Sequence, residues 1–175
     1  MSRRLGIYLD TQNLWHSAVK YGERHGIDRA RLQYAVLMDL IAKHGDVSVA
    51  KAFVVEHPKF DAKPFVVALE VLGVETFVKK MRQYKERVAR ADWDVGITVH
   101  VLTGLAMDRW DTLVLASGDS DFLPLIEAVK ERGKDVFICS FDDALGAEMK
   151  SAATGVITLG RSVLFQTDPR QSVSQ

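Results

Sequence analysis

The sequence has little cysteine and no excess of charge of either sign. Cys139 is the single cysteine, so no disulfide can form within the chain, and we expect a reducing, cytoplasmic setting. The 23 basic and 23 acidic residues give a formal net charge of zero, so overall charge gives no argument for nucleic-acid binding. Any such function must therefore depend on local clusters of basic residues.

Further absences exclude several classes of protein. No apolar stretch is long enough to cross a bilayer and no signal peptide is evident, so we expect a soluble protein with no membrane partner. The five histidines are scattered, which with the single cysteine argues against a zinc site. A glycine-rich phosphate loop is missing, which argues against a GTPase or kinase. A phosphatase of the haloacid-dehalogenase type needs a second aspartate two residues after Asp10, where Gln12 stands.

What the sequence does contain is an alternation of short apolar runs and helical patterns. Runs typical of buried strands span residues 4–10, 47–56, 74–80, 111–117, 134–140 and 155–159, and helical patterns cover 30–45, 61–73, 93–108, 121–133 and 142–153. Because the strands are continuously apolar, helices should cover both faces of the sheet. We predict an α/β fold, a Rossmann-like (PIN-like) three-layer sandwich with a mainly parallel central sheet. Residues 1–165 should form this single domain, and the polar residues 166–175 a disordered tail.

Acidic residues fall where strands are expected to end. Asp10 closes the first strand, Asp119 and Asp121 follow the strand 111–117, and Asp94 opens the helix 93–108. Since parallel strands place their carboxyl ends at one edge of a sheet, Asp10, Asp119 and Asp121 should lie close together, and Asp94 can join them if its helix begins at that edge. Crowded carboxylates stay ionised only beside a counter-charge, and their oxygens suit Mg²⁺ or Mn²⁺. A metal ion held in this way suits phosphate substrates.

A purely structural interpretation of these residues is also open. Serine and aspartate are preferred at helix N-termini, so Ser117, Asp119 and Asp121 could simply cap the helix 121–133. Asp10 alone suits a turn, and Asp94 alone suits the start of a helix. The joint placement of the four acids at one sheet edge is what favours a metal site.

Three blocks of the sequence stand out by their order and spacing: IYLDTQNLWHSA (7–18), DWDVGITVHVLTGLA (92–106) and DTLVLASGDSDFLPLIEAVKERGKDVFI (111–138). Together they resemble the NYN-domain family, the LabA-like branch of the PIN-like nuclease superfamily. The resemblance implies metal-dependent cleavage of RNA or another nucleic acid, with Mg²⁺ or Mn²⁺ as cofactor. Matched position by position, the resemblance implies that the catalytic residues and metal ligands are Asp10, Asp94, Asp119 and Asp121. It also implies that Asn13 is a further catalytic residue.

The second block departs from the family pattern at two places. Ala91-Asp92 replaces the usual Lys-Gly, and His100 replaces a further Asp. Asp92 is a candidate substitute ligand, whereas His100, six residues beyond Asp94, is rotated by about 240° on a helix and need not face the same point. The alternative function is therefore a catalytically weak or inactive RNA-binding or regulatory module. A third alternative is a protein that acts through homo-oligomers, with carboxylates that only cap helices.

A basic segment precedes Asp94. KKMRQYKERVAR, residues 79–90, holds six basic residues and one acidic residue. Trp93 could stack on the bases of RNA, with single strands favoured, whereas we expect Trp15 to pack in the core. A solvated surface segment is the alternative interpretation. The residues predicted to bind RNA phosphates are Lys79, Lys80, Arg82, Lys85, Arg87 and Arg90.

Overall fold

The computed structural model describes residues 3–59, 61–81, 83–84, 87–88 and 91–165. The predicted tail 166–175 lies outside this part of the chain, as do Arg82, Lys85 and Arg90 and the side chain of Arg87. The strands are β1 (Arg4–Asp10), β2 (Asp46–Glu56), β3 (Glu75–Lys80), β4 (Gln83–Tyr84), β5 (Arg87–Val88), β6 (Thr112–Ala116), β7 (Asp135–Phe141) and β8 (Gly155–Leu159). The α-helices are α1 (Thr11–His25), α2 (Tyr34–Ala42), α3 (Lys63–Val71), α4 (Asp94–Ala106), α5 (Leu123–Glu131) and α6 (Ala147–Ala152).

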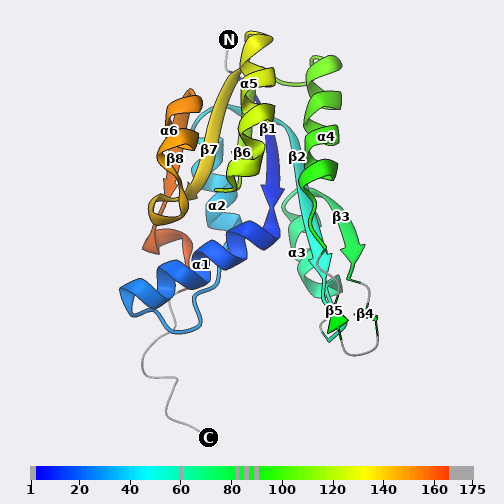
Figure 1. Cartoon of the computed structure of the whole chain (residues 1–175), viewed down its shortest axis with the longest axis vertical. Coiled ribbons are helices and arrows are strands. Elements are labelled where there is room, and N and C mark those ends of the chain that lie inside the picture. The colour runs from blue at the N-terminus through cyan, green and yellow to red at the C-terminus, as the bar shows by residue number, and fades with distance from the viewer. Residues whose placement is uncertain (1–2, 60, 82, 85–86, 89–90, 166–175) are drawn as a thin grey trace, which may run out of the picture.

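Six strands form one parallel sheet in the order β3-β2-β1-β6-β7-β8 (Figure 1). The chain passes from β1 to β2 and β3 on one side, and then returns to β6, β7 and β8 on the other. The carboxyl ends of β1 and β6 are therefore neighbours at a point where the winding direction reverses, with Leu9 paired to Ala116. Ligand sites in such sheets lie outside the strand ends at this reversal.

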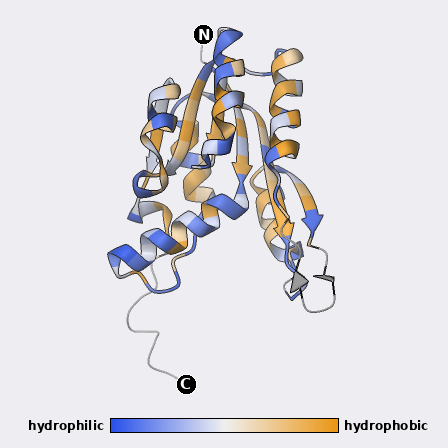
Figure 2. Ribbon diagram, in the orientation of Figure 1, coloured by the Kyte–Doolittle hydropathy of each residue, from blue (hydrophilic) through white to orange (hydrophobic). Residues whose placement is uncertain are grey.

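Helices cover both faces of the sheet, as the sequence predicts. Apolar residues of α1, α2 and α3 pack with one set of strand residues, and those of α4, α5 and α6 pack with the other. Within β1 the side chains alternate: Leu5, Ile7 and Leu9 face the first group and Tyr8 faces the second. Hydrophobic colouring runs through the strands of the sheet in Figure 2. The predicted three-layer α/β sandwich is confirmed.

The connection between α4 and β6 leaves no room for a side chain at Gly6 in β1. A Cβ atom there would overlap the indole ring of Trp110, which is fully buried. The Trp110 Nε1–H donates to the Tyr8 hydroxyl at 3.2 Å, and the two rings meet edge to face. Gly6 is thus required by a close aromatic approach to the sheet.

Two differences from the sequence prediction concern the chain after β1. Helix α1 was not expected, yet it starts directly after Asp10, which caps its N-terminus, and ends at Gly26, whose φ is 66°. The helix predicted from residue 30 begins only at Tyr34, because the preceding residues bridge to the end of the domain. Leu32 pairs with Leu164, and the Gln33 side chain donates to the Leu164 carbonyl at 2.7 Å.

No helix in the described part of the chain combines the length and the apolar content that a membrane span requires.

Candidate metal centre

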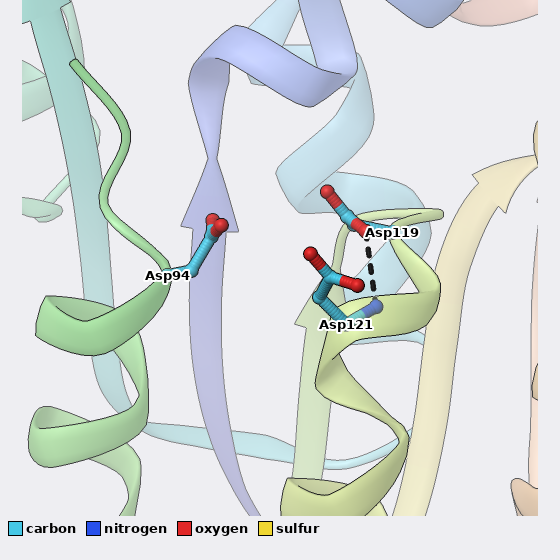
Figure 3. A group of neighbouring side chains, drawn as sticks. All are labelled: Asp94, Asp119 and Asp121. Carbon is cyan, nitrogen blue, oxygen red and sulfur yellow. Dashed lines mark hydrogen bonds between the residues drawn. The ribbon is translucent and has the colours of Figure 1, made fainter. Parts of the chain in front are cut away.

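Three carboxylates meet at the edge of the sheet where the winding reverses. Asp94, Asp119 and Asp121 each offer an oxygen, and these oxygens lie within 4.8 Å of one another. In Figure 3, Asp94 approaches from the start of α4, and the other two approach from the turn after β6. Residues separated by more than twenty positions in the sequence are therefore brought together by the parallel sheet.

The turn that carries two of the acids has a defined local geometry. Asp119 is extended and caps a short 3₁₀ turn, Ser120–Phe122, and its carboxylate accepts the Asp121 N–H at 3.0 Å. Phe122 is buried and fixes the turn on the core, after which α5 continues with Pro124 in its first turn. Asp119 thus caps the 3₁₀ turn and not α5 itself, whose N-cap residue Phe122 makes no side-chain cap hydrogen bond, and both acidic side chains remain at the cluster.

The dimensions and chemistry of the cluster suit a hard divalent cation. Oxygens on opposite sides of one Mg²⁺ are about 4.2 Å apart, given Mg–O lengths of about 2.0–2.1 Å. The three acids are close to this arrangement and supply the carboxylate oxygens that Mg²⁺ and Mn²⁺ prefer. The ion pairs within the described part of the chain involve other acids, so these carboxylates have no protein cation beside them.

The pKa of Asp94 reflects burial and the neighbouring negative charges. Its pKa is raised to about 6, first by burial and then by the negative charges of Asp92, Asp119, Asp10 and Asp121. A positive ion in the cluster would remove the repulsion and favour the ionised carboxylate.

Asp10 lies behind this group. Its carboxylate accepts the Asn13 N–H at 3.1 Å and the Ser117 hydroxyl at 3.1 Å. Burial raises its pKa, the hydrogen bonds from Asn13 and Ser117 oppose that rise, and the charge of Asp119 adds to it. The structure therefore places Asp10 next to the three acids but outside the group that is close enough to share an ion. Its role as a direct metal ligand stays a prediction.

Ser117 and Asn13 connect Asp10 to the acidic turn. The buried Ser117 Oγ also accepts the Asp119 N–H at 3.3 Å, and the Asn13 side-chain oxygen accepts the Gly118 N–H at 2.9 Å. The first turn of α1 thus holds the backbone immediately before Asp119. These contacts support a positioning role for both residues.

The two residues that depart from the family pattern, Asp92 and His100, lie in different surroundings. Asp92 is exposed, and its backbone carbonyl accepts the Lys79 ammonium at 2.6 Å. The His100 ring lies beside Phe77, with ring centres 4.3 Å apart, and its Nδ1 is 3.4 Å from the Lys51 Nζ. Burial, and then the charge of Lys51, lower the His100 pKa. Neither side chain belongs to the three-acid group.

Lys79 and Lys80, whose side chains are described within the basic segment 79–90, have partners within the protein. Lys79 lies 4.9 Å from the centre of the Trp93 ring, and Lys80 pairs with Glu56 at 3.3 Å while remaining largely exposed. The Trp93 Nε1–H donates to the Val54 carbonyl at 2.9 Å. The predicted roles of these residues in RNA binding stay predictions, as do those of Arg82, Lys85, Arg87 and Arg90.

The expectation for Trp15 was wrong. This side chain is exposed (54%) rather than packed in the core, because it lies on the flank of α1, away from the buried positions Leu14 and Ala18. Because the helix Thr11–His25 was not predicted, the direction of the Trp15 side chain could not be assigned. The spacing of Leu14, Ala18 and Gly22, followed by Gly26 as a C-cap, was the available signal.

Fold and site together define a parallel three-layer α/β domain with a carboxylate cluster where its winding reverses. A family model of the NYN domain, a nuclease-like and nucleic-acid-related domain, matches residues 4–160, and the chain belongs to this family.

Individual relatives agree with this membership. The chain is 24% identical over 176 residues to the low amplitude and bright protein LabA of Synechococcus elongatus, covering 94% of this chain and 89% of that protein. It is 29% identical over 85 residues to an uncharacterised protein of Methanocaldococcus jannaschii, covering 49% of this chain and 35% of that one. The crystal structure of a protein of unknown function from Vibrio parahaemolyticus shares the fold, with a TM-score of 0.76, 24% identity and coverage of 94% and 97% of the two chains.

Proposed function

We propose that this NYN domain is a metal-dependent ribonuclease that hydrolyses phosphodiester bonds with Mg²⁺ or Mn²⁺. The observation that carries the proposal is the meeting of Asp94, Asp119 and Asp121 at the edge of the sheet where ligands bind, with no ion pair to a basic residue of the described part of the chain. Family membership supports the same chemistry, because the NYN domain is nuclease-like.

Each residue of the site has a distinct task in this proposal. Asp94, Asp119 and Asp121 would hold the cation, while Asn13 and Ser117 keep the turn that carries two of them in place. A bound divalent ion supplies activation of water and stabilisation of charge on the phosphate. Asp10 keeps Ser117 oriented through its hydrogen bond, and it adds negative charge that strengthens attraction for the cation.

RNA is the proposed substrate, held through its phosphates by the basic segment 79–90. Lys80 is the best placed of the described bases, since its side chain is 82% exposed. To bind a phosphate it would leave Glu56, whose side chain is 18% exposed and also accepts the Ala62 N–H. Lys79 would have to leave the Asp92 carbonyl to do the same.

A binding module with weak or no turnover is the second candidate. The observation that favours it is the position of His100, which replaces a family acid and turns toward Lys51 and Phe77 instead of joining the cluster. Such a protein would bind RNA in a salt-dependent manner and leave it intact.

Cleavage of single-stranded RNA separates these possibilities. Wild-type protein and the control Asp39→Asn, an exposed acid on α2, should cleave with Mg²⁺ or Mn²⁺ and stop when EDTA is added. Asp119→Asn should be slower by at least about 100-fold, because loss of a group that only supports a metal ligand already costs about 10- to 100-fold and Asp119 is proposed as a ligand itself. Equal rates for Asp119→Asn and wild type would contradict the nuclease proposal, and RNA binding without cleavage would select the binding module.

A further inference from the structure

Helix α4 presents an apolar stripe to solvent. Val95, Val99 and Leu102 are 76%, 56% and 40% exposed, and Ala106 is exposed as well. Steps of four, three and four residues separate them, so they form one line along the helix, which we call the α4 stripe. The buried residues of the helix lie about half a turn away, toward the sheet, and are Ile97, Val101 and Gly104. The α4 stripe therefore faces directly away from the rest of the domain.

The α4 stripe lies on a helix surface without charged side chains. Residues 95–106 contain no lysine, arginine, aspartate or glutamate. Helix α5, which packs on the same face of the sheet, instead exposes Glu127, Lys130 and Glu131. Apolar colouring covers most of α4 in Figure 2, whereas α5 is divided between polar and apolar colouring. A helix with only one buried side normally carries polar residues on the other, as α5 does, so α4 has the composition of a helix covered on both sides.

Several occupants fit the α4 stripe poorly. Nucleic acids and anionic membranes bind through basic residues, which are missing from this surface. Residues 166–175 of the chain itself are mostly polar and offer no apolar segment to cover it. A protein surface remains, and the flank of the stripe tolerates one: the Thr103 hydroxyl donates to the Val99 carbonyl at 2.8 Å, so covering it leaves no unpaired donor.

A second copy of the chain fits because the α4 stripe matches its own reverse. The steps of four, three and four read the same in both directions. An antiparallel second copy of α4 would therefore set Val95 against Ala106 and Val99 against Leu102 about a two-fold axis. Alternating steps of three and four form the seam of paired helices. The formal net charge of the chain is zero, so overall repulsion does not oppose association of two copies.

We propose that two copies of this protein form a dimer in which their α4 helices pack antiparallel along the α4 stripe. A contact made by one pair of helices is small, so the dimer belongs to the weak, concentration-dependent class. Because α4 begins at Asp94, the two acidic clusters would lie at opposite ends of the seam, about 20 Å apart along the helix axis. The dimer does not depend on the nuclease proposal, and its test needs neither metal nor RNA.

Sedimentation equilibrium tests the surface. Wild type should show a monomer–dimer equilibrium with Kd between about 1 and 100 µM. Val99→Glu places two like charges in the seam and should raise Kd by at least about 10-fold. Val71→Glu is the matched control, since it makes the same substitution at an 80% exposed valine of α3, on the other face of the sheet. Its Kd should stay within about two-fold of wild type, with circular dichroism showing that both variants fold.

Disulfide formation tests the direction of pairing. A mixture of Val95→Cys and Ala106→Cys proteins should crosslink. Val95→Cys alone should not, because its two cysteines would be separated by eleven residues, about 16 Å of helix rise, whereas a disulfide needs Cα atoms within about 7 Å. The native Cys139 is buried and does not compete.

Three outcomes would overturn the inference. The first is a wild type that remains monomeric at about 1 mM, which would leave the α4 stripe without a second copy. The second is an equal Kd for Val99→Glu and wild type, or a dimer weakened by Val71→Glu alone, which would place the contact elsewhere. The third is crosslinking of Val95→Cys with itself and not with Ala106→Cys, which would contradict the antiparallel arrangement.

Discussion

The side-chain oxygen of Asn13 accepts the backbone N–H of Gly118 at 2.9 Å, which joins the first turn of α1 to the residue before Asp119. We predict that Asn13→Ala leaves this partly buried N–H unpaired and lowers the free energy of unfolding by about 1–3 kcal/mol. For a domain of this size, Tm should fall by about 2–4 °C for each kcal/mol. The variant should also bind Mn²⁺ more weakly, because the turn carrying Asp119 and Asp121 loses its brace.

Gln12→Ala is the matched control for that change. It removes a neighbouring side chain on the same helical turn and keeps the Gln12 backbone contact to Asp10. Its stability should stay within about 0.5 kcal/mol of wild type in chemical denaturation. Equal Mn²⁺ affinities for Asn13→Ala and Gln12→Ala, measured by calorimetry, would show that the Asn13–Gly118 hydrogen bond does not contribute to metal binding by the cluster.

Divalent ions should stabilise the folded protein. At a free Mn²⁺ concentration near 100 times Kd, binding to the folded state raises the free energy of unfolding by about 2.7 kcal/mol. Tm should therefore rise by about 5–10 °C. Asp121→Asn should lose most of this rise, and Asp39→Asn should keep it. Scanning calorimetry with and without EDTA provides the measurement. If Mn²⁺ does not change the Tm of wild type, the result would support the interpretation that the carboxylates act only as helix caps.

The raised pKa of Asp94 predicts a pH dependence in metal-free protein. Its folded-state pKa of about 6 exceeds the ordinary value of 3.8, so the protonated form favours the folded state. This favourable contribution is complete below pH 3.8 and is lost as the pH rises through about 6. In EDTA, Asp94→Asn should therefore gain stability over wild type at pH 7.5, by about 1 kcal/mol after solvent screening, with little difference at pH 4.

Thermal unfolding of both proteins from pH 4 to pH 8 tests the sign of this effect. Added Mn²⁺ should make wild type the more stable protein at pH 7.5. Wild type can hold the ion with the Asp94 carboxylate, which Asp94→Asn lacks. A constant difference in stability between the two proteins across the pH range would count against a raised pKa of Asp94.

Gly6→Ala should destabilise the fold without involving the site. The added methyl group overlaps the fully buried Trp110 ring, which cannot move away cheaply. Overpacking of this kind costs about 1–3 kcal/mol. Gly146→Ala is the control, because a Cβ there meets nothing within 4 Å and the φ of −64° suits alanine. Urea denaturation should separate the two variants, and equal midpoints would contradict the packing argument.

The sequence predicted the sheet well because its strands are apolar on both faces. β8 matches its predicted range, and β1 does as well. Helix α1 was missed for a physical reason: its buried face consists of Thr11, Leu14, Ser17, Ala18 and Gly22, which are mostly small or polar. Small residues let a helix approach a sheet closely, but they give only a weak apolar periodicity, which the spacing of Leu14, Ala18 and Gly22 carries.

For the site, strand order was enough to predict that distant aspartates converge. It did not predict how Asp10 differs from the other three, because that depends on side-chain direction. The Asp10 carboxylate accepts hydrogen bonds from the Ser117 hydroxyl and the Asn13 N–H, and it thereby holds the turn in place. Asp94, Asp119 and Asp121 instead face one another. Trp15 was misplaced for the same reason, since the direction of a side chain on an unpredicted helix cannot be assigned.

Strand β1 passes into helix α1 at Asp10 with no loop between them. A tilt of the helix cannot be absorbed by slack in the connection, so it must be transmitted to the Asp10, Asn13 and Ser117 contacts that hold the acidic turn. Anything that pulls on the outer surface of α1 is therefore mechanically coupled to the spacing of the carboxylates.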